Sequence, residues 1–122
     1  MTAKEHPYDL EERTAKFGEQ VIALCRSIKK GPITDPLVNQ LIRAGTSVGA
    51  NYMEANGASS KRDFVNKIFI CKKESQESKH WLRMLASSGN TADENELRSL
   101  WREAQELTLI FQKITSSIRK SV

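Results

Sequence analysis

The sequence predicts an all-α protein, an antiparallel up-down-up-down four-helix bundle in which residues 1–122 form one domain. Apolar residues recur at alternating steps of three and four in four separate segments, the spacing that keeps one stripe of a helix against its neighbours. Short segments containing glycine, proline or serine separate these four runs. Because short connections make consecutive helices antiparallel neighbours, a bundle is the expected architecture.

The first helix is expected over about residues 8–30, since Gly31-Pro32 directly follows its stripe. Acidic residues lie in its first turn, and Lys29 and Lys30 lie in its last turn, both favourable to the helix dipole. The stripe consists of Leu10, Thr14, Phe17, Val21, Leu24 and Ile28.

The second helix is expected over about residues 35–56, with Thr34 as its N-cap. Gly45 and Gly49 lie one turn apart within it, and each destabilises a helix by about 1 kcal/mol relative to alanine. We therefore expect a tight helix crossing at these glycines, inside the bundle or against another subunit. The stripe consists of Leu37, Leu41, Ala44, Val48, Tyr52 and Ala55.

The third and fourth helices are expected over about residues 60–88 and 93–120. Ser59 or Ser60 is the N-cap candidate of the third helix, and Thr91 or Asp93 that of the fourth. The third stripe consists of Phe64, Ile68, Cys71, Ser75, Ser78, Leu82 and Leu85. The fourth consists of Leu97, Leu100, Ala104, Leu107, Phe111, Ile114 and Ile118.

Composition limits the possible location of the protein. No segment is long and apolar enough to span a membrane, and the first ten residues lack the apolar core of a signal peptide. We therefore expect a cytoplasmic protein without membrane contact. Cys25 and Cys71 lie near the apolar stripes and are expected to be buried free thiols.

The net charge of +4 is concentrated in one segment. Residues 58–89 hold seven Lys and Arg against three acids, whereas residues 1–57 balance seven against seven and residues 90–122 five against five. A basic helix favours a polyanion partner, and the alternative is an ordinary solvated helix face. The candidate nucleic-acid-binding residues are Lys61, Arg62, Lys67, Lys72, Lys73, Lys79 and Arg83.

A polar stripe on the second helix lies beside its apolar stripe. Half-buried polar groups need hydrogen-bond partners. We therefore expect a polar layer between the second and third helices, in which Arg43 pairs with Glu74 or Glu54. The residues of this structural polar layer are Arg43, Ser47, Asn51, Glu54 and Glu74.

Catalytic and metal-binding patterns are weak. Glu77 and His80 form one E-x-x-H motif with Glu74 one turn earlier, but the second such motif of a di-metal bundle is missing. Nor does any serine or cysteine have a convincing base and orienting group. We expect no enzymatic activity, no metal and no cofactor. A metal-dependent enzyme that uses Glu74, Glu77 and His80 is left as an alternative.

Several large apolar residues fall outside the four stripes, which favours a second buried surface and hence an oligomer. They are Ile22, Val38, Ile42, Met53, Phe69, Ile70, Trp81, Met84, Trp101, Leu109 and Ile110.

Three stretches together resemble the signature of a bacterial four-helix-bundle family. They are residues 41–55 (LIRAGTSVGANYMEA), 60–64 (SKRDF) and 73–82 (KESQESKHWL). The family includes proteins encoded in intervening sequences of 23S ribosomal RNA genes, and the resemblance extends over about residues 10–120. Departures are mild: Ser75 stands where alanine is expected, and His80 where an aromatic ring is expected.

The resemblance implies a ring-shaped homopentamer with a basic surface and no known enzymatic activity. A more distant relative, the accessory protein of diversity-generating retroelements, works with a reverse transcriptase and RNA. The hypothesis is therefore a non-enzymatic oligomer that binds structured RNA, or DNA, through phosphate contacts. Specificity for sequence should be weak, because the sequence indicates neither an aromatic stacking platform nor a reading motif. The alternative is a protein–protein scaffold, an accessory subunit that holds an enzyme partner without touching nucleic acid.

Overall fold

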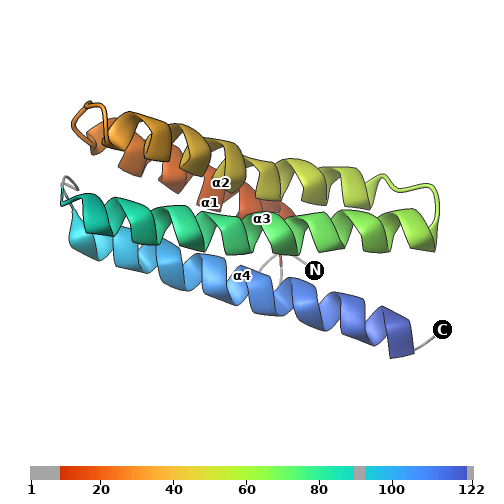
Figure 1. Ribbon diagram of the computed structural model, residues 1–122. Helices are drawn as coiled ribbons and strands as arrows, with labels where there is room; N and C mark the ends of the chain where they lie inside the picture. Colours follow the sequence, from red (N-terminus) through yellow and green to blue (C-terminus); the bar gives the residue numbers. More distant parts are fainter. Residues whose placement is uncertain (1–8, 90–92, 121–122) are drawn as a thin grey trace.

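A computed structural model describes residues 9–89 and 93–120. These residues form four α-helices and no strand: α1 (Leu10–Ser27), α2 (Thr34–Asn56), α3 (Lys61–Ser88) and α4 (Glu94–Lys120). The helices lie side by side, and consecutive helices run in opposite directions (Figure 1). The predicted all-α four-helix bundle is confirmed.

The first helix is shorter than the sequence predicts, because α1 ends at Ser27 and Ile28 is extended. The Ser27 hydroxyl donates to the Leu24 carbonyl at 2.7 Å, a local bond that competes with helix continuation. Thr34 is the first residue of α2 rather than its N-cap, and its buried hydroxyl donates to the Lys29 carbonyl at 2.8 Å. This bond spans the connection, so Lys29 belongs to the turn and not to the helix.

The other helix ends follow the sequence signals. The Ser60 hydroxyl accepts a hydrogen bond from the Asp63 N–H at 3.0 Å, and Asp93 accepts one from the Glu96 N–H at 3.0 Å. Gly89 ends α3 with a φ of 72°, the left-handed conformation that glycine adopts without strain. Thr91, the other candidate cap of the fourth helix, lies outside the described residues.

The four predicted stripes meet along the bundle axis and form the core. Every position of the α1 stripe is buried, and so is every position of the α3 stripe except Phe64. Cys25 and Cys71 are buried free thiols. Burial raises the pKa of the Cys25 thiol to about 11 and that of Cys71 to about 12. Both cysteines therefore act as small apolar core residues.

The glycines of α2 pack against α1. A Cβ atom added to Gly45 would lie 2.9 Å from Cγ2 of Val21, and one added to Gly49 would lie 3.3 Å from Oγ1 of Thr14. Gly18 of α1 faces the same contact, where an added Cβ would lie 3.6 Å from Cα of Thr46. The tight crossing predicted from Gly45 and Gly49 is therefore present, and it lies inside the bundle.

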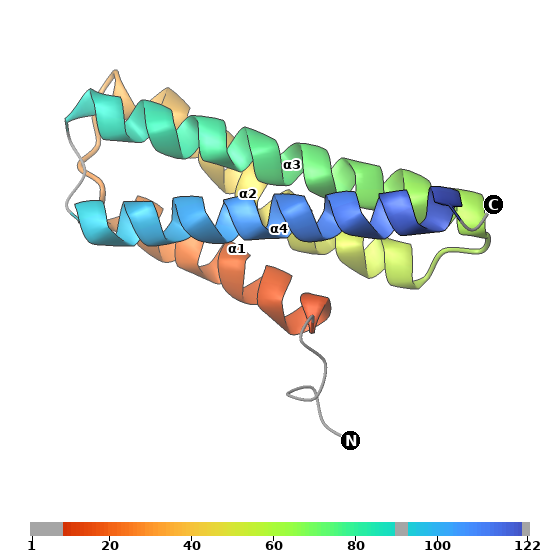
Figure 2. The same ribbon diagram turned by 90° about the horizontal axis from the view of Figure 1, so that it is seen from below.

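An ion-pair cluster joins α1 to α4. Nε of Arg13 lies 2.7 Å from Oε2 of Glu103, and its Nη2 lies 2.9 Å from Oε1 of both Glu103 and Glu106. The C-terminal half of α4 continues beyond the first turn of α1, alongside α2 and α3 (Figure 2). Arg13 thus fixes the position along α4 at which the shorter helix begins.

Candidate nucleic-acid interface

The structure separates the seven basic residues of α3 into different environments. Lys67 faces α2, where its Nζ lies 2.7 Å from Oε1 of Glu54. Lys72 and Lys79 face α4, where they donate hydrogen bonds to Gln112 and Gln105. The remaining four are exposed and make no hydrogen bond or ion pair within residues 9–89 and 93–120: Lys61, Arg62, Lys73 and Arg83.

Helical geometry shows which of these residues share one side. With about 100° of rotation per residue, Lys61, Lys72, Lys79 and Arg83 fall within roughly 40° of one another. This side lies next to α4, as the bonds of Lys72 and Lys79 show. The seven residues therefore do not form a single continuous face, and Lys67 lies on the opposite flank of α3.

The register of α3 and α4 adds residues of α4 to this side. Lys72 is level with Gln112 and Lys79 with Gln105, so seven residues forward on α3 match seven residues backward on α4. Arg83, four residues after Lys79, is by the same register level with Trp101, four residues before Gln105. Arg98 is exposed and lies one turn before Trp101.

We call this surface the α3–α4 basic edge, and it consists of Lys61, Lys72, Lys79 and Arg83 of α3 with Arg98 and Trp101 of α4. Counting charge by segment missed Arg98, because the acids and bases of residues 90–122 balance. Trp101 stood out in the sequence as an apolar residue outside the stripes, but its neighbours depend on the helix register.

Trp101 differs from the other aromatic side chains near the core because 39% of it is exposed. Nζ of Lys79 lies 5.3 Å from the centroid of its ring, within the range of a cation–π interaction. An exposed aromatic ring therefore lies beside basic residues at this edge.

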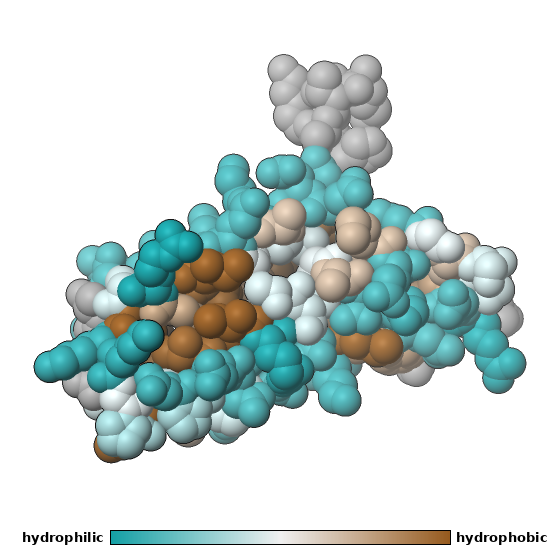
Figure 3. Space-filling model, turned by 90° about the horizontal axis from the view of Figure 1, so that it is seen from above, coloured by the Kyte–Doolittle hydropathy of each residue, from teal (hydrophilic) through white to brown (hydrophobic). Residues whose placement is uncertain are grey.

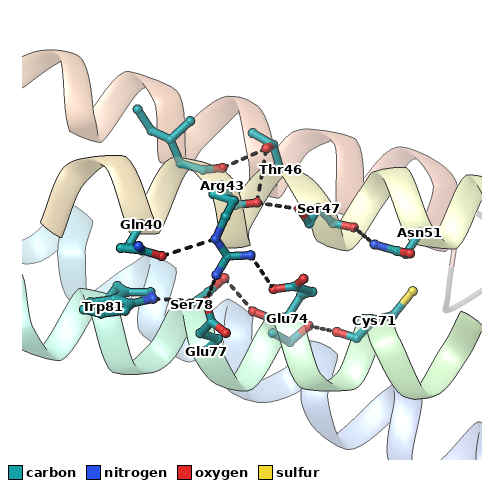
Figure 4. A network of polar contacts seen from close by, with 12 residues as sticks. Gln40, Arg43, Thr46, Ser47, Asn51, Cys71, Glu74, Glu77, Ser78 and Trp81 are labelled. Atoms are coloured by element: carbon teal, nitrogen blue, oxygen red, sulfur yellow. Dashed lines mark hydrogen bonds and ion pairs between the residues drawn. The ribbon is translucent and has the colours of Figure 1, made fainter. Parts of the chain in front are cut away.

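The carboxylates of α3 are held on its other flank, toward α2. Nη1 of Arg43 lies 3.4 Å from Oε1 of Glu74, and its Nη2 forms an ion pair with Glu77 (Figure 4). The Trp81 indole N–H also donates to Glu77, at 3.3 Å. Both carboxylates therefore pair with one cation of α2, on the flank of α3 that faces away from the α3–α4 basic edge.

Fewer of the residues in the predicted polar layer bond across α2 and α3 than expected. The pair of Arg43 with Glu74 is present, whereas Glu54 pairs with Lys67 and not with Arg43. Ser47 and Asn51 bond to carbonyls of their own helix, Ser47 to Arg43 at 2.6 Å and Asn51 to Ser47 at 2.9 Å (Figure 4). Short hydroxyl and amide side chains reach their own backbone more easily than a neighbouring helix.

The E-x-x-H motif has a structural environment. Glu74 and Glu77 are bound to Arg43, while His80 is exposed and its ring centroid lies 4.8 Å from that of Trp81. Within the described part of the chain, no three metal-ligating side chains come together.

An apolar groove of about 320 Å³ lies between α1 and α2, on the far side of the bundle from the basic edge. Gly18, Gly49 and Ala50 form its floor, and the exposed side chains of Ile22 and Met53 flank it. Seen from above, apolar side chains gather over α1 and α2 in a band between hydrophilic ones (Figure 3). None of the four described helices combines the length and apolar character of a bilayer span.

The bundle and its basic edge define a small all-α protein with a charged surface along two neighbouring helices. Residues 8–113 match the family model of the 23S rRNA-intervening sequence protein, and the chain belongs to this family. It is also similar to a crystal structure of a protein of unknown function from the S23 ribosomal protein family of Bacteroides thetaiotaomicron VPI-5482. The TM-score is 0.74 at 26% identity, and the match covers 86% of this chain and 96% of that chain. Comparison with curated proteins finds no match.

Proposed function

We propose that this protein binds structured RNA without catalysing a reaction, and that the α3–α4 basic edge contacts the phosphates. The observation that carries this proposal is the separation of charge on α3. Exposed cations such as Arg83 lie toward α4, whereas Glu74 and Glu77 pair with Arg43 on the other flank. Such a surface attracts mainly the phosphate backbone of a polyanion, so the affinity for RNA should fall steeply as the salt concentration rises.

We further propose that the protein is a cytoplasmic ring-shaped homopentamer. Membership of the family supports this assembly, and so do exposed apolar side chains such as Ile22, Met53 and Leu109, which a single bundle leaves in water. Five copies of a chain of net charge +4 carry about +20 in total. One copy attracts a polyanion only modestly. A ring of five copies would attract it more strongly.

The test begins with native mass spectrometry of protein purified gently at low salt. A five-subunit particle with additional nucleic-acid mass supports both proposals and supplies the RNA for sequencing. A particle with a different number of subunits contradicts the pentamer. A bare particle that also binds no added RNA at low salt contradicts the RNA-binding function.

Charge reversal locates the interface. Lys72→Glu, Lys79→Glu and Arg83→Glu combined should abolish RNA binding. The matched control reverses Lys16, Arg26 and Lys29 of the α1 region, which are also exposed, and should retain most of the affinity despite the same net charge. Equal losses in the two variants would contradict a localised interface.

A second candidate function is a protein scaffold that holds an enzyme partner. The apolar groove between α1 and α2 favours it, because an apolar depression flanked by Ile22 and Met53 can receive an apolar side chain of another protein. Met53→Asp should then abolish partner capture while charge reversal of the basic edge leaves it intact. If the protein binds RNA instead, charge reversal of the basic edge should abolish RNA binding, and Met53→Asp should leave it intact.

A further inference from the structure

We infer that Trp101 is a stacking platform for an unpaired base, so that the basic edge binds RNA where the strand is single or looped out. This inference rests on the proposed function and specifies its substrate. It depends on the environment of the indole ring, which neither the family match nor the S23 neighbour assigns.

The position of Trp101 is unusual for a large aromatic residue. It lies outside the apolar stripe of α4, where Leu97, Leu100 and Ala104 are buried. With 39% of the side chain exposed, the ring contributes to the surface, and a base could cover it without repacking the core. Covering an exposed indole also removes apolar surface from water, which favours binding.

The ring is surrounded by cations. Lys79 lies over it with Nζ at 5.3 Å from the centroid, Arg98 lies one turn before it, and Arg83 is level with it across the helix pair. Lys79 is held by a neutral amide and an aromatic ring, so its charge is not neutralised by a carboxylate. Its ammonium group can therefore bind a phosphate beside a stacked base.

The α4 positions nearest to the ring carry no carboxylate. The α4 positions one turn before and after Trp101 are not acidic: Leu97, Arg98, Ala104 and Gln105. Glu103, the acidic residue closest in sequence, and Glu106 are bound to Arg13 on the α1 side of α4. A nucleotide approaching Trp101 thus meets positive charge and an apolar face together.

This combination selects for unpaired nucleotides. Single-strand-binding proteins pair a positively charged path for the backbone with aromatic side chains on which bases stack. A base inside a duplex is already stacked between its neighbours and must leave the helix to reach a protein ring. The edge should therefore prefer single-stranded RNA to a duplex with the same number of phosphates per strand.

The first experiment uses Trp101 as its own reporter. The chain has two tryptophans, so Trp81→Phe leaves Trp101 as the single one. Oligouridine of about 12 nucleotides, within the size range of single-strand sites, is titrated against a duplex of the same length at equal salt. We expect oligouridine to quench Trp101 emission and bind more tightly than the duplex. Equal affinity for both, or binding without a change in emission, would overturn the inference.

The second experiment separates stacking from charge in the full-length chain. Trp101→Phe keeps an aromatic ring and should keep most of the affinity for oligouridine, whereas Trp101→Leu keeps only apolar bulk and should weaken binding by about tenfold. If Trp101→Leu binds like the wild type while reversal of Lys72, Lys79 and Arg83 abolishes binding, the function stands and the stacking inference is wrong. If neither RNA binds any form, the proposed function itself fails.

Native mass spectrometry of Trp101→Leu excludes an indirect effect. The inference requires that this variant has the same number of subunits as the wild type. A change in subunit number would show that Trp101 belongs to a contact between copies, and would overturn its role as a base platform.

Discussion

Gly45 of α2 lies directly against Val21 of α1, so closely that an added methyl group would stand 2.9 Å from Cγ2 of the valine. Val21 is completely buried, and its Cβ and Cγ1 would also lie within 3.2 Å of that methyl group. Glycine is unfavourable in the middle of a helix, by about 1 kcal/mol relative to alanine. The close approach of the two helix backbones offsets this loss through dispersion contacts that a larger residue would prevent.

Gly45→Ala should therefore destabilise the bundle. Overpacking a core costs roughly 1–3 kcal/mol, and improved helix propensity returns about 1 kcal/mol, so we expect a net loss of up to about 2 kcal/mol. Urea unfolding followed by circular dichroism measures it. Gly57→Ala is the control, since its nearest contact would be 3.8 Å away, and it should stay within about 0.5 kcal/mol. A Gly45→Ala protein more stable than the wild type would contradict the close packing.

Arg13 should be the most important ion-pairing residue for stability. It makes two bonds to Glu103 across α1 and α4, and these bonds and the adjacent Glu106 raise the pKa of Arg13 despite partial burial. Bidentate, partly buried pairs are stronger than exposed ones. A double-mutant cycle with Arg13→Gln and Glu103→Gln should give a coupling energy of about 1–2 kcal/mol. Arg26→Gln, on the exposed face of the same helix, should have almost no effect.

The buried thiols should make stability depend on alkaline pH. Burial raises the pKa of Cys25 from 9.0 to about 11 and that of Cys71 from 9.0 to about 12. Above pH 9 the unfolded chain loses these protons while the folded chain retains them, so the free energy of unfolding falls as pH rises toward 11. The Cys25→Ala, Cys71→Ala double variant should show a shallower fall in urea titrations at pH 8, 9 and 10. Identical slopes would mean that other groups cause the alkaline loss.

The same burial predicts thiol reactivity. Alkylation requires the thiolate, so native protein at pH 8 should react with iodoacetamide far more slowly than protein in urea. Mass spectrometry after timed quenching counts the modified cysteines. Rapid modification of either thiol in the native protein would contradict its burial.

The apolar repeat carried most of the information about the fold, including Ser75 and Ser78, which are fully buried at stripe positions although they are polar. Their hydroxyls donate to carbonyls of α3 itself, so a small polar residue can occupy a stripe without a partner helix. The periodicity could not give the end of α1, because the bond of Thr34 to the Lys29 carbonyl depends on the path of the turn.

Pairings between helices were harder to predict than the stripes. Arg43 had two candidate carboxylates, and only the relative rotation of α2 and α3 pairs it with Glu74 and leaves Glu54 to Lys67. The residues of α3 that lie next to Trp101 likewise depend on the register in which α4 packs against α3. Helical spacing on one chain segment fixes a face, but it contains no information about the axial offset of the next helix.

The last prediction concerns Lys67, which tests whether RNA contacts both flanks of α3 or only the flank that faces α4. Its bond to Glu54 raises the pKa of Lys67 and neutralises its charge, whereas Arg83 is exposed and has no carboxylate partner in the described residues. If the α3–α4 basic edge binds RNA, Arg83→Gln should lower the salt dependence of binding by about one unit of slope, as expected for one lost phosphate contact. Lys67→Gln should leave that slope almost unchanged. Fluorescence anisotropy with labelled RNA at several salt concentrations measures both. Equal reductions would mean that RNA contacts both flanks of α3 and that the whole helix, not its α4 side, forms the interface.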